Sequence, residues 1–357
     1  MLLVSSVTMI LRNNFPNDDR VKKEVETLAS KFEIRIMHTG TKKDERLMPI
    51  YFPKKRFLAI PYYPIYILLL SLKAISAKAD IYHCHDLDTL LAGYIASRIR
   101  KAKLVYDSHE VFTEMPGIAS MTKPFWKILE KMLINKSDLF ITTNKYRMDF
   151  FKRKYKVKKT FILENLPKRK KPFKKIFGEN VIFLYQGAIS SKRGIDNLFK
   201  AFLELPEDKA ELIVVGSFEK SDVEPVKNKN ITLTGYIPLE EISRYEEKSD
   251  VGIAFYISQT VNTKYPSSNK VFRYLQNGMA IITSKSPCFK NLIKNKKYGI
   301  MLNPEKKEEI KEAMQWFIKN KKKVRESSKE KMKLINEDYT WEEQEKEFLR
   351  IYEQIIE

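Results

Sequence analysis

The chain has 357 residues, 43% of them hydrophobic, which is enough for a large buried core in two domains and excludes a disordered tail. Its formal net charge of +21 leaves nucleotides, anionic lipids and nucleic acids as partner classes to consider. The two cysteines, Cys84 and Cys288, lie far apart in apolar runs, which excludes a disulfide framework and favours a reducing cytoplasm.

The N-terminal region combines a strand, a helix and one long apolar stretch. The opening MLLVSSVTMILRNNF has neither a basic flank nor a small-residue cleavage site, so we expect a first buried strand and a protein that stays in the cytoplasm. Apolar residues recur with helical spacing between Asp18 and Phe32, which predicts a helix. The stretch FLAIPYYPIYILLLSL, Phe57 to Leu72, is shorter than the roughly 20 residues that a spanning helix needs, so we expect a buried or membrane-interface helix.

Apolar runs of strand length recur along the whole chain and alternate with amphipathic helical patterns. Near-continuous hydrophobic strands alternating with helices predict parallel sheets covered on both faces, and hence an α/β protein. Six runs precede the segment Pro167 to Lys175 and six follow it, which suggests two doubly wound, Rossmann-like domains. The runs are LLVSSV, EIRIMH, DIYHCH, KLVYDSH, LFITT and TFILEN, then VIFLYQG, ELIVVGS, ITLTGY, VGIAFY, AIITS and GIMLN.

The most basic segment, KRKKPFKK from Lys168 to Lys175, lies between the two sets of strands. It is either a solvated interdomain linker or a dedicated patch for an acidic partner, and we favour the linker. The remaining lysines are scattered and no small nucleic-acid-binding module is recognisable, so no nucleic acid partner is expected.

Ligands of doubly wound sheets bind outside the carboxyl ends of the strands, so the residues directly after each run are the functional candidates. Neither GxGxxG nor GxxxxGK[ST] occurs in the sequence and no cluster has the spacing of a zinc site, so we expect no dinucleotide fingerprint, P-loop or metal. A cleft between the domains is the simplest geometry that brings the strand ends of both halves together. The polar strand-end segments are His85-Asp86, His109-Glu110, Gly187 to Gly194, Gly235-Tyr236 and Ser267 to Lys270.

The last of these segments belongs to YPSSNKVFRYLQNGMAIITS, Tyr265 to Ser284, where small polar residues and a lysine stand at the start of a helix. Free backbone N–H groups and the positive end of the helix dipole favour an anion at such a place. The residues Ser267 to Lys270 are therefore predicted to hold an anion. Arg273, one turn into the helix, is a second cation whose role depends on that ligand.

Six segments follow one another in a characteristic order: FPNDDRVKKEVETLAS, DIYHCHDLDTLLAGYIASRIRKAKLVYDSHEVF, YQGAISSKRGIDNLFKAF, ITLTGYIPLEEI, SSNKVFRYLQNGMAIITS and YTWEEQEKEFLRIYEQI. In this order and spacing they resemble the GT-B nucleotide-sugar glycosyltransferases and, more closely, glycosyltransferase family 4. The resemblance implies two Rossmann-like domains facing a cleft, with an acceptor-side domain over 1–167 and a nucleotide-sugar-binding domain over 168–336. It also implies a C-terminal helix over 337–357 that packs back toward the first domain.

The resemblance assigns roles to individual residues. His109 matches the histidine beside the donor sugar, and with Asp86 and Glu110 it forms the candidate catalytic set, whereas His85 with Asp86 is expected to shape the acceptor side. Arg193 matches the basic residue that holds the diphosphate, while Lys192 either contributes or faces solvent. The candidate donor-binding residues are Gly187, Lys192, Arg193, Gly235, Tyr236, Ser267, Ser268, Asn269, Lys270 and Arg273.

Two positions depart from the family pattern. Similar sequences carry a glutamate that accepts hydrogen bonds from the ribose where this chain has Arg273, and many carry another where it has Tyr265. Arginine has only donors, so it cannot replace such an acceptor. Three interpretations stay open: Arg273 contacts ribose oxygens or an acidic group of an unusual donor, it turns outward while another residue holds the ribose, or the chain has kept the fold and lost catalysis.

The resemblance implies a hexosyltransferase-type enzyme that moves a sugar from a UDP- or GDP-type donor to a saccharide or polyprenyl-linked acceptor in surface polysaccharide assembly, with retention of configuration. It implies no cofactor and no metal, because Arg193, Lys270 and a helix terminus would stabilise the leaving group. Together with the basic charge, it implies a cytoplasmic protein attached peripherally to the inner face of the plasma membrane. The alternative is a catalytically inactive GT-B scaffold or binding subunit of a polysaccharide complex.

Overall fold

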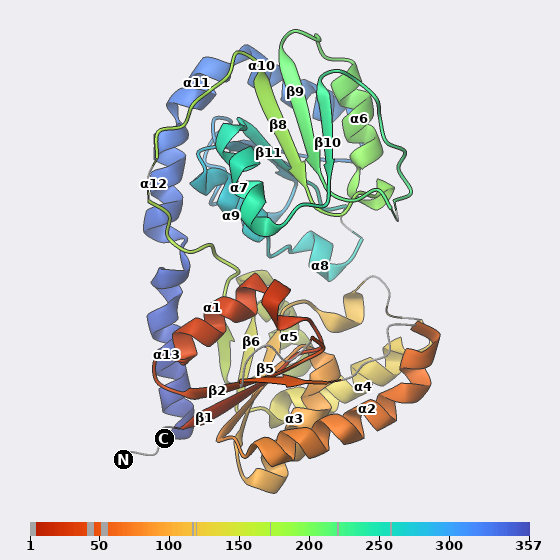
Figure 1. Cartoon of the computed structure of the whole chain (residues 1–357), viewed down its shortest axis with the longest axis vertical. Coiled ribbons are helices and arrows are strands. Elements are labelled where there is room, and N and C mark those ends of the chain that lie inside the picture. Colours follow the sequence, from red (N-terminus) through yellow and green to blue (C-terminus); the bar gives the residue numbers. More distant parts are fainter. Residues whose placement is uncertain are drawn as a thin grey trace. The chain divides into compact units, whose positions relative to one another are not determined.

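The computed structural model describes residues 5–40, 46–50, 56–115, 118, 120–171, 173–219, 221–257 and 259–357, without the side chains of 56–62 and 239–240. The chain divides into two compact units, shown in Figure 1. The first unit consists of Met1–Asn165 and Gln344–Glu357, and the second of Leu166–Glu343. The first boundary therefore falls two residues before the expected one, and the chain returns to the first unit at Gln344 rather than at residue 337.

The first unit is built on a parallel sheet whose described residues form seven strands in the order β3-β2-β1-β4-β5-β6-β7. This is the doubly wound order, and it reverses between β1 and β4. The strands are β1 (Ser6–Ile10), β2 (Glu33–His38), β3 (Leu47–Pro49), β4 (Ile81–His85), β5 (Lys103–Ser108), β6 (Leu139–Thr142) and β7 (Thr160–Ile162). The helices are α1 (Asp19–Leu28), α2 (Arg56–Ala77), α3 (Leu87–Arg100), α4 (Lys123–Leu133), α5 (Lys145–Tyr155) and α13 (Trp341–Ile356).

Two strands of this sheet differ from the expected ones. The first strand is Ser6–Ile10, later than the expected LLVSSV, because the four residues from Val7 to Ile10 are the ones that pair with both β2 and β4. The residues before position 5 lie outside the described part of the chain. The strand β3 was not predicted, since three residues that end in a proline give no alternating apolar pattern.

The C-terminal helix α13 packs on the first unit. The ring of Phe348 stacks near that of Phe161 on β7, with centroids 6.2 Å apart, and the hydroxyl of Tyr352 lies 2.7 Å from Nδ1 of His83 on β4. At the start of this segment, Glu164 and Gln344 exchange two hydrogen bonds of 2.9 and 2.7 Å. The helix therefore completes the core of the first unit, as the resemblance implies.

Helix α2 contains the apolar stretch that was expected to form a buried or membrane-interface helix. Tyr66, Ile67 and Leu70 are buried, whereas the opposite face of the helix exposes aliphatic side chains. No helix in the described part of the chain combines the length and apolar character that crossing a bilayer requires.

The second unit is built on another parallel sheet, whose described residues form six strands in the order β10-β9-β8-β11-β12-β13. This is again the doubly wound order, with the reversal between β8 and β11. The strands are β8 (Val181–Gln186), β9 (Ala210–Val215), β10 (Ile231–Gly235), β11 (Val251–Ala254), β12 (Ala280–Ser284) and β13 (Gly299–Leu302). The helices are α6 (Ile195–Leu203), α7 (Leu239–Lys248), α8 (Val261–Lys264), α9 (Asn269–Gln276), α10 (Lys307–Lys319), α11 (Lys321–Glu326) and α12 (Ser328–Asp338).

The basic segment Lys168 to Lys175 is only in part the solvated linker that the sequence favoured: Lys168, Arg169, Lys171 and Lys174 are exposed, whereas Lys170 and Lys175 have partners in the second unit. Nζ of Lys170 donates to Glu247 and Asn277, both at 2.7 Å, and Lys175 is buried with Nζ 2.9 Å from the carbonyl of Asn277. Burial lowers the pKa of Lys175 to about 7. Two lysines of the segment therefore pack against the second unit, which the composition could not predict because it does not show which lysines find partners.

Candidate active site

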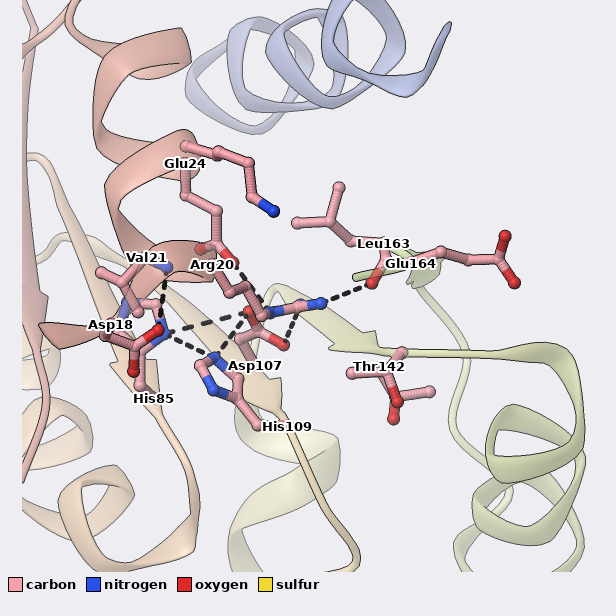
Figure 2. Close-up of polar contacts among 12 residues, drawn as sticks. Asp18, Arg20, Val21, Glu24, His85, Asp107, His109, Thr142, Leu163 and Glu164 are labelled. Carbon is pink, nitrogen blue, oxygen red and sulfur yellow. Dashed lines mark hydrogen bonds and ion pairs between the residues drawn. The ribbon is translucent and has the colours of Figure 1, made fainter. Parts of the chain in front are cut away.

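The carboxyl ends of β4 and β5 bring the candidate residues of the first unit together. Side chains alternate along a strand, so His83 and His85 share one face of β4, and Asp107 and His109 share one face at the end of β5. His85 pairs with Asp107 across the two strands. Figure 2 shows that His85, Asp107 and His109 converge, and the first two are buried. The structure therefore brings the segments His85-Asp86 and His109-Glu110 together at one edge of the sheet.

His109 is held both at its ring and at its backbone. Nε2 of the ring lies 3.0 Å from Nδ1 of His85 and 3.4 Å from Oδ2 of Asp107. The backbone N–H donates to Oδ1 of Asp86 at 3.0 Å, and the carbonyl accepts from Arg147. Among the described residues Nδ1 of His109 has no hydrogen-bond partner, and 16% of the side chain is exposed, so this edge of the ring can meet a ligand.

Asp86 adopts a backbone conformation that serves this contact. It follows β4 with φ of 62° and ψ of 168°, a region that residues other than glycine occupy only at a cost. Its N–H donates to the carbonyl of Asp107 at 2.8 Å while its carboxylate accepts from His109. Burial raises the pKa of Asp86 to about 7, although His109 opposes the shift. Glu110, the third catalytic candidate, is half-buried, and its carbonyl accepts from the hydroxyl of Ser108.

Arg20 joins this cluster from α1. The carboxylate of Asp18 caps the helix, and from that start Arg20 and Glu24, four residues apart, reach the same buried face. Nη2 of Arg20 donates to Oδ1 and Oδ2 of Asp107 at 3.0 and 2.9 Å, as Figure 2 shows. Nη1 donates to the carbonyl of Leu163 at 2.6 Å, and Nε lies 3.0 Å from Oε1 of Glu24.

The buried ionisable groups of this cluster shift one another's pKa values. Burial opposes ionisation of Asp107, but Arg20 and His109 outweigh it and hold the pKa of its carboxyl well below the usual range. Burial also opposes protonation of His109, yet Asp107 and Asp86 outweigh it and raise the pKa of the ring to about 9. Burial lowers the pKa of His85 well below the ordinary value. At neutral pH, His109 is therefore the charged imidazole and His85 the neutral one.

The ligand atoms of Glu24, His83, His85 and Asp107 lie within 4.8 Å of one another, a grouping that would suit a metal ion if Arg20 were absent. Arg20 already donates to both oxygens of Asp107 and pairs with Glu24. A guanidinium in that position neutralises the carboxylates that a cation would need. We therefore treat the group as an ion-pair and hydrogen-bond network.

In the second unit, the chain turns tightly at the carboxyl end of β8. Gly187 has φ of 133° and donates its N–H to the carbonyl of Val215 at 2.9 Å. A Cβ on Gly187 would lie 3.2 Å from Nζ of Lys270, and one on Gly216 would lie 2.2 Å from the carbonyl of Gly187. Both positions therefore require glycine. The space they leave lets Nζ of Lys270 reach the carbonyl of Gln186 at 3.0 Å.

Two cations share this strand end. Arg193 closes the short 3-10 helix that follows the Gly187 turn, and Lys270 is the second residue of α9. Burial and then the charge of Arg193 lower the pKa of Lys270 to about 7, and no carboxylate of the described chain acts on it. Because two cations held together repel each other, an anion placed between them would stabilise both.

A cavity of about 530 Å³ opens beside the Gly187 turn. Its wall is formed by the segments that follow β8, β9 and β10, including Gly187, Gly216 and Tyr236, with Ile242 of α7. The ring of Tyr236 is 80% exposed, and the isoleucine makes part of the wall apolar. A pocket of this size and mixed character suits a nucleotide-sized ligand.

Some of the remaining predicted donor-binding residues lie near the Gly187 turn, and others lie away from it. The carbonyl of Gly235 accepts from the N–H of Gly216 at 3.0 Å, so Gly235 lies in the same neighbourhood. Ser268 is the buried residue before α9, and its hydroxyl accepts from Tyr256 at 2.5 Å. Ser267 precedes it and Asn269 begins the helix, whereas the side chain of Lys192 is exposed. The structure thus brings Gly187, Gly235, Arg193 and Lys270 together and leaves Lys192 at the surface.

Comparison with known proteins agrees with this division of the chain. Residues 22–165 match the model of Glycosyltransferase Family 4, and residues 167–334 match the model of Glycosyl transferases group 1. The chain belongs to the GT-B glycosyltransferases. An uncharacterized glycosyltransferase of Methanocaldococcus jannaschii is 24% identical to it over 301 residues, which are 74% of this chain and 72% of that protein.

Solved structures share the fold of this glycosyltransferase over nearly its whole length. Sucrose-phosphate synthase from Thermosynechococcus elongatus has a TM-score of 0.73 at 14% identity, covering 98% of this chain and 99% of that one. A glycosyltransferase from Rickettsia africae has a TM-score of 0.72 at 12% identity, covering 99% of both chains. The Anabaena protein HepE in complex with UDP-glucose has a TM-score of 0.71 at 12% identity, covering 98% of this chain and 99% of that one. At these identities the likeness shows the GT-B fold.

Arg273 stands where similar glycosyltransferases carry their ribose-binding glutamate, and here its partner is inside the second unit. Nη2 of Arg273 lies 2.9 Å from Oε2 of Glu246, a buried residue of α7, and the arginine side chain is 17% exposed. Glu246 also accepts from Gln186 at 3.2 Å and from Asn277 at 3.0 Å. Arg273 therefore does not turn outward, as the second interpretation had it, but pairs with a buried carboxylate of the same unit.

We expect Arg273→Glu to destabilise this glycosyltransferase by about 3 kcal/mol or more, because it would set a second carboxylate against buried Glu246. A second change, Glu246→Gln, should restore part of that loss. The melting temperature measures both effects. The control is Arg244→Glu, an exposed arginine of α7 that should change stability by about 0.5 kcal/mol at most. Equal melting temperatures for Arg273→Glu and the parent would contradict a stabilising Arg273–Glu246 ion pair and would favour a contact of Arg273 with the donor.

Sequence reasoning missed the residues that support His109. Arg20 and Glu24 lie in a helix that was predicted from its apolar residues alone. Asp107 lies within a predicted strand rather than after it. None of the three was therefore proposed as a site residue. The spacing of two in HCH and DSH was a usable signal, because it places His83 beside His85 and Asp107 beside His109 on their strands. Glu246 gave no local signal, since its partner Arg273 comes from another helix.

Proposed function

We propose that this glycosyltransferase transfers a hexose from a UDP- or GDP-type donor to a saccharide or polyprenyl-linked acceptor in surface polysaccharide assembly, with retention of configuration. The observation that carries the proposal is the pair of cations, Lys270 and Arg193, beside the glycine-lined turn at the end of β8. A diphosphate supplies the negative charge that this pair lacks. The complex of the Anabaena protein with UDP-glucose supports a nucleotide sugar as the ligand.

In the proposed reaction, the bond between the sugar C1 and the diphosphate oxygen breaks and the acceptor oxygen bonds to C1. The proton of the acceptor hydroxyl passes to the departing diphosphate. Arg193 and Lys270 stabilise the negative charge that develops on that diphosphate, so the step needs no metal ion. His109, charged at neutral pH and open at Nδ1, donates a hydrogen bond to the donor sugar, as the resemblance implies.

A panel of sugar nucleotides tests this function. The purified protein is incubated with each UDP, GDP and ADP sugar and with saccharide and polyprenyl phosphate acceptors, and products are read by mass spectrometry. We expect one donor class to give a glycosylated product or slow hydrolysis. Nucleotide binding without turnover of any donor would favour the inactive scaffold, for which the missing glutamates are the motivating observation.

An exposed apolar face on the first unit supports attachment to a membrane. Helix α2 exposes Ile65, Leu68, Leu69 and Leu72, which follow one another at helical spacing, and the described parts of α4 expose Phe125, Ile128 and Met132. Tyr63 and Phe125 bring the two helices into contact, with ring centroids 6.2 Å apart, and the helices lie side by side in Figure 1. Exposed lysines flank the α4 residues. Such a patch suits the surface of an anionic bilayer.

We expect the protein to float with anionic vesicles at low salt and to be released in part at high salt, since each lysine near the lipid contributes about 1 kcal/mol. The double change Leu69→Glu and Leu72→Glu should abolish flotation because it puts charge into the apolar face. The control is Leu203→Glu, an exposed leucine of the second unit. Equal flotation of the double variant and the parent would contradict the proposed docking face.

A further inference from the structure

The buried face of α1 carries charges that the proposed transfer does not use. Arg20 and Glu24 are almost fully buried, although a helix that only covers the sheet would be built more simply with apolar residues there. Burying charged groups costs free energy even when they are paired, so such groups are concentrated where their partners are functional. The contacts of Arg20 therefore indicate its role.

Arg20 fixes the orientation of one carboxylate. Its guanidinium is anchored by the carbonyl of Leu163 and binds both oxygens of Asp107, which prevents that carboxylate from rotating. In this orientation Oδ2 of Asp107 faces Nε2 of His109 at 3.4 Å and Nε2 of His83 at 3.7 Å. The orientation of the His109 ring thus depends on a group set by α1.

We propose that Arg20 is a positioning residue for His109, acting through Asp107 so that Nε2 faces inward and Nδ1 stays open to the donor sugar. The inference deepens the proposed function and rests on it only in taking His109 as the residue that meets the donor. A lysine could supply the charge of Arg20 but not the three separate nitrogens with which Arg20 contacts Asp107, the carbonyl of Leu163 and Glu24.

Several charged and titratable groups face His109, and together they predict how the loss of Arg20 would change the pKa of His109. His85 and Asp86 face it from β4, Asp107 from β5, and Arg147 of α5 through the carbonyl of His109. Arg20 and Glu24 of α1 act on it from behind Asp107. Without Arg20, the repulsion that its charge exerts on protonated His109 would be lost and Asp107 would pair with His109 alone, so the ring would keep its proton to higher pH while the carboxylate would no longer be held in one orientation.

The four histidines of the chain make imidazole NMR a direct test that needs no donor. In full-length protein labelled at histidine, the His109 signal is the one that disappears in His109→Asn. We expect its protonation midpoint near the parent value of about 9. In Asp107→Asn it should fall toward the ordinary value of about 6.5, because the main counter-charge is lost, whereas in Arg20→Gln it should rise, because the charge of Arg20 lowers the pKa of His109 in the parent. Arg325→Gln, which removes a comparable buried Arg–Asp pair from the second unit, should leave it unchanged.

Kinetics with the donor selected by the panel give the second readout. Arg20→Gln should lower kcat by about 10-fold or more and leave the donor KM within about threefold, and Arg20→Lys should fall between it and the parent. Arg20→Lys also serves if the glutamine variant does not fold. An unchanged His109 midpoint in a folded Arg20 variant, or the same shift in Arg325→Gln, would overturn the proposal. If no sugar nucleotide of the panel is turned over, the proposed function is refuted, but the NMR result on Arg20 and His109 remains valid.

Discussion

Replacing His109 with Asn is expected to lower kcat of sugar transfer by about 100-fold or more while the donor KM stays within about threefold. The nucleotide site of the second unit does not include His109, so binding should survive the change. The charged ring, in contrast, is a group that asparagine cannot imitate. Initial rates over a range of donor concentrations separate the two parameters.

The control for this variant is Glu130→Gln, which disturbs a different buried network of the first unit, where Glu130 accepts from Tyr106 at 3.1 Å and from Tyr155 at 2.5 Å. It should lower the melting temperature and keep kcat. A loss of kcat in His109→Asn no larger than in Glu130→Gln would remove His109 from the reaction.

The pH profile of the parent follows from the same assignment. Asp107 and Asp86 raise the pKa of His109 to about 9 against the effect of burial, and the protonated ring exists below that value. Activity that depends on this ring should therefore hold through neutral pH and be lost as the pH rises through about 9. In Asp107→Asn the same loss should occur at lower pH. A loss near the ordinary histidine value in both proteins would contradict the charged state of His109.

The sequence predicted the two parallel sheets because their strands are continuous apolar runs, a pattern that depends only on burial from both sides. It also placed His85-Asp86 and His109-Glu110 directly after strands, where ligands of doubly wound sheets bind. The support behind His109 was not predicted. The burial of Arg20 depends on Asp107 and Leu163, more than 80 residues away in the chain, and no local pattern contains such a contact.

Arg273 is another residue of which the sequence predicted one property and missed another. Its departure from the family pattern was visible in the sequence, and the absence of an acceptor in arginine was a sound physical argument. Its partner Glu246 lies on α7 and meets it only in the folded unit. The contacts of Lys170 and Lys175 in the basic segment were not predicted for the same reason, because their partners are residues 246, 247 and 277.

Lys270→Met is expected to weaken binding of the nucleoside diphosphate by about 10- to 150-fold, since a charge-assisted contact with phosphate contributes about 1.5–3 kcal/mol and the variant leaves Arg193 alone. The free protein should become more stable, because a buried lysine with a lowered pKa costs stability whenever it is charged. The sign follows from linkage: between about 7 and 10.5 the unfolded chain binds more protons than the folded one, so parent stability rises with pH in that window.

The control for this variant is Lys319→Met, an exposed lysine at the end of α10 that should change neither binding nor the pH dependence of stability. Arg193→Ala should weaken binding by a similar factor to Lys270→Met, because both cations face the same diphosphate. Unchanged affinity in both site variants would place the nucleotide elsewhere.

Calorimetric titration with UDP and with GDP at about pH 8, in two buffers of different ionisation enthalpy, tests most directly whether Lys270 and Arg193 hold a diphosphate. Bound phosphate would favour the charged form of Lys270, whose pKa in the free protein is lowered to about 7 by burial and by Arg193. We therefore expect one nucleotide to bind the parent with net proton uptake, and the uptake to vanish in Lys270→Met. Binding without proton uptake, or no binding of either nucleotide, would contradict the assignment of the donor site.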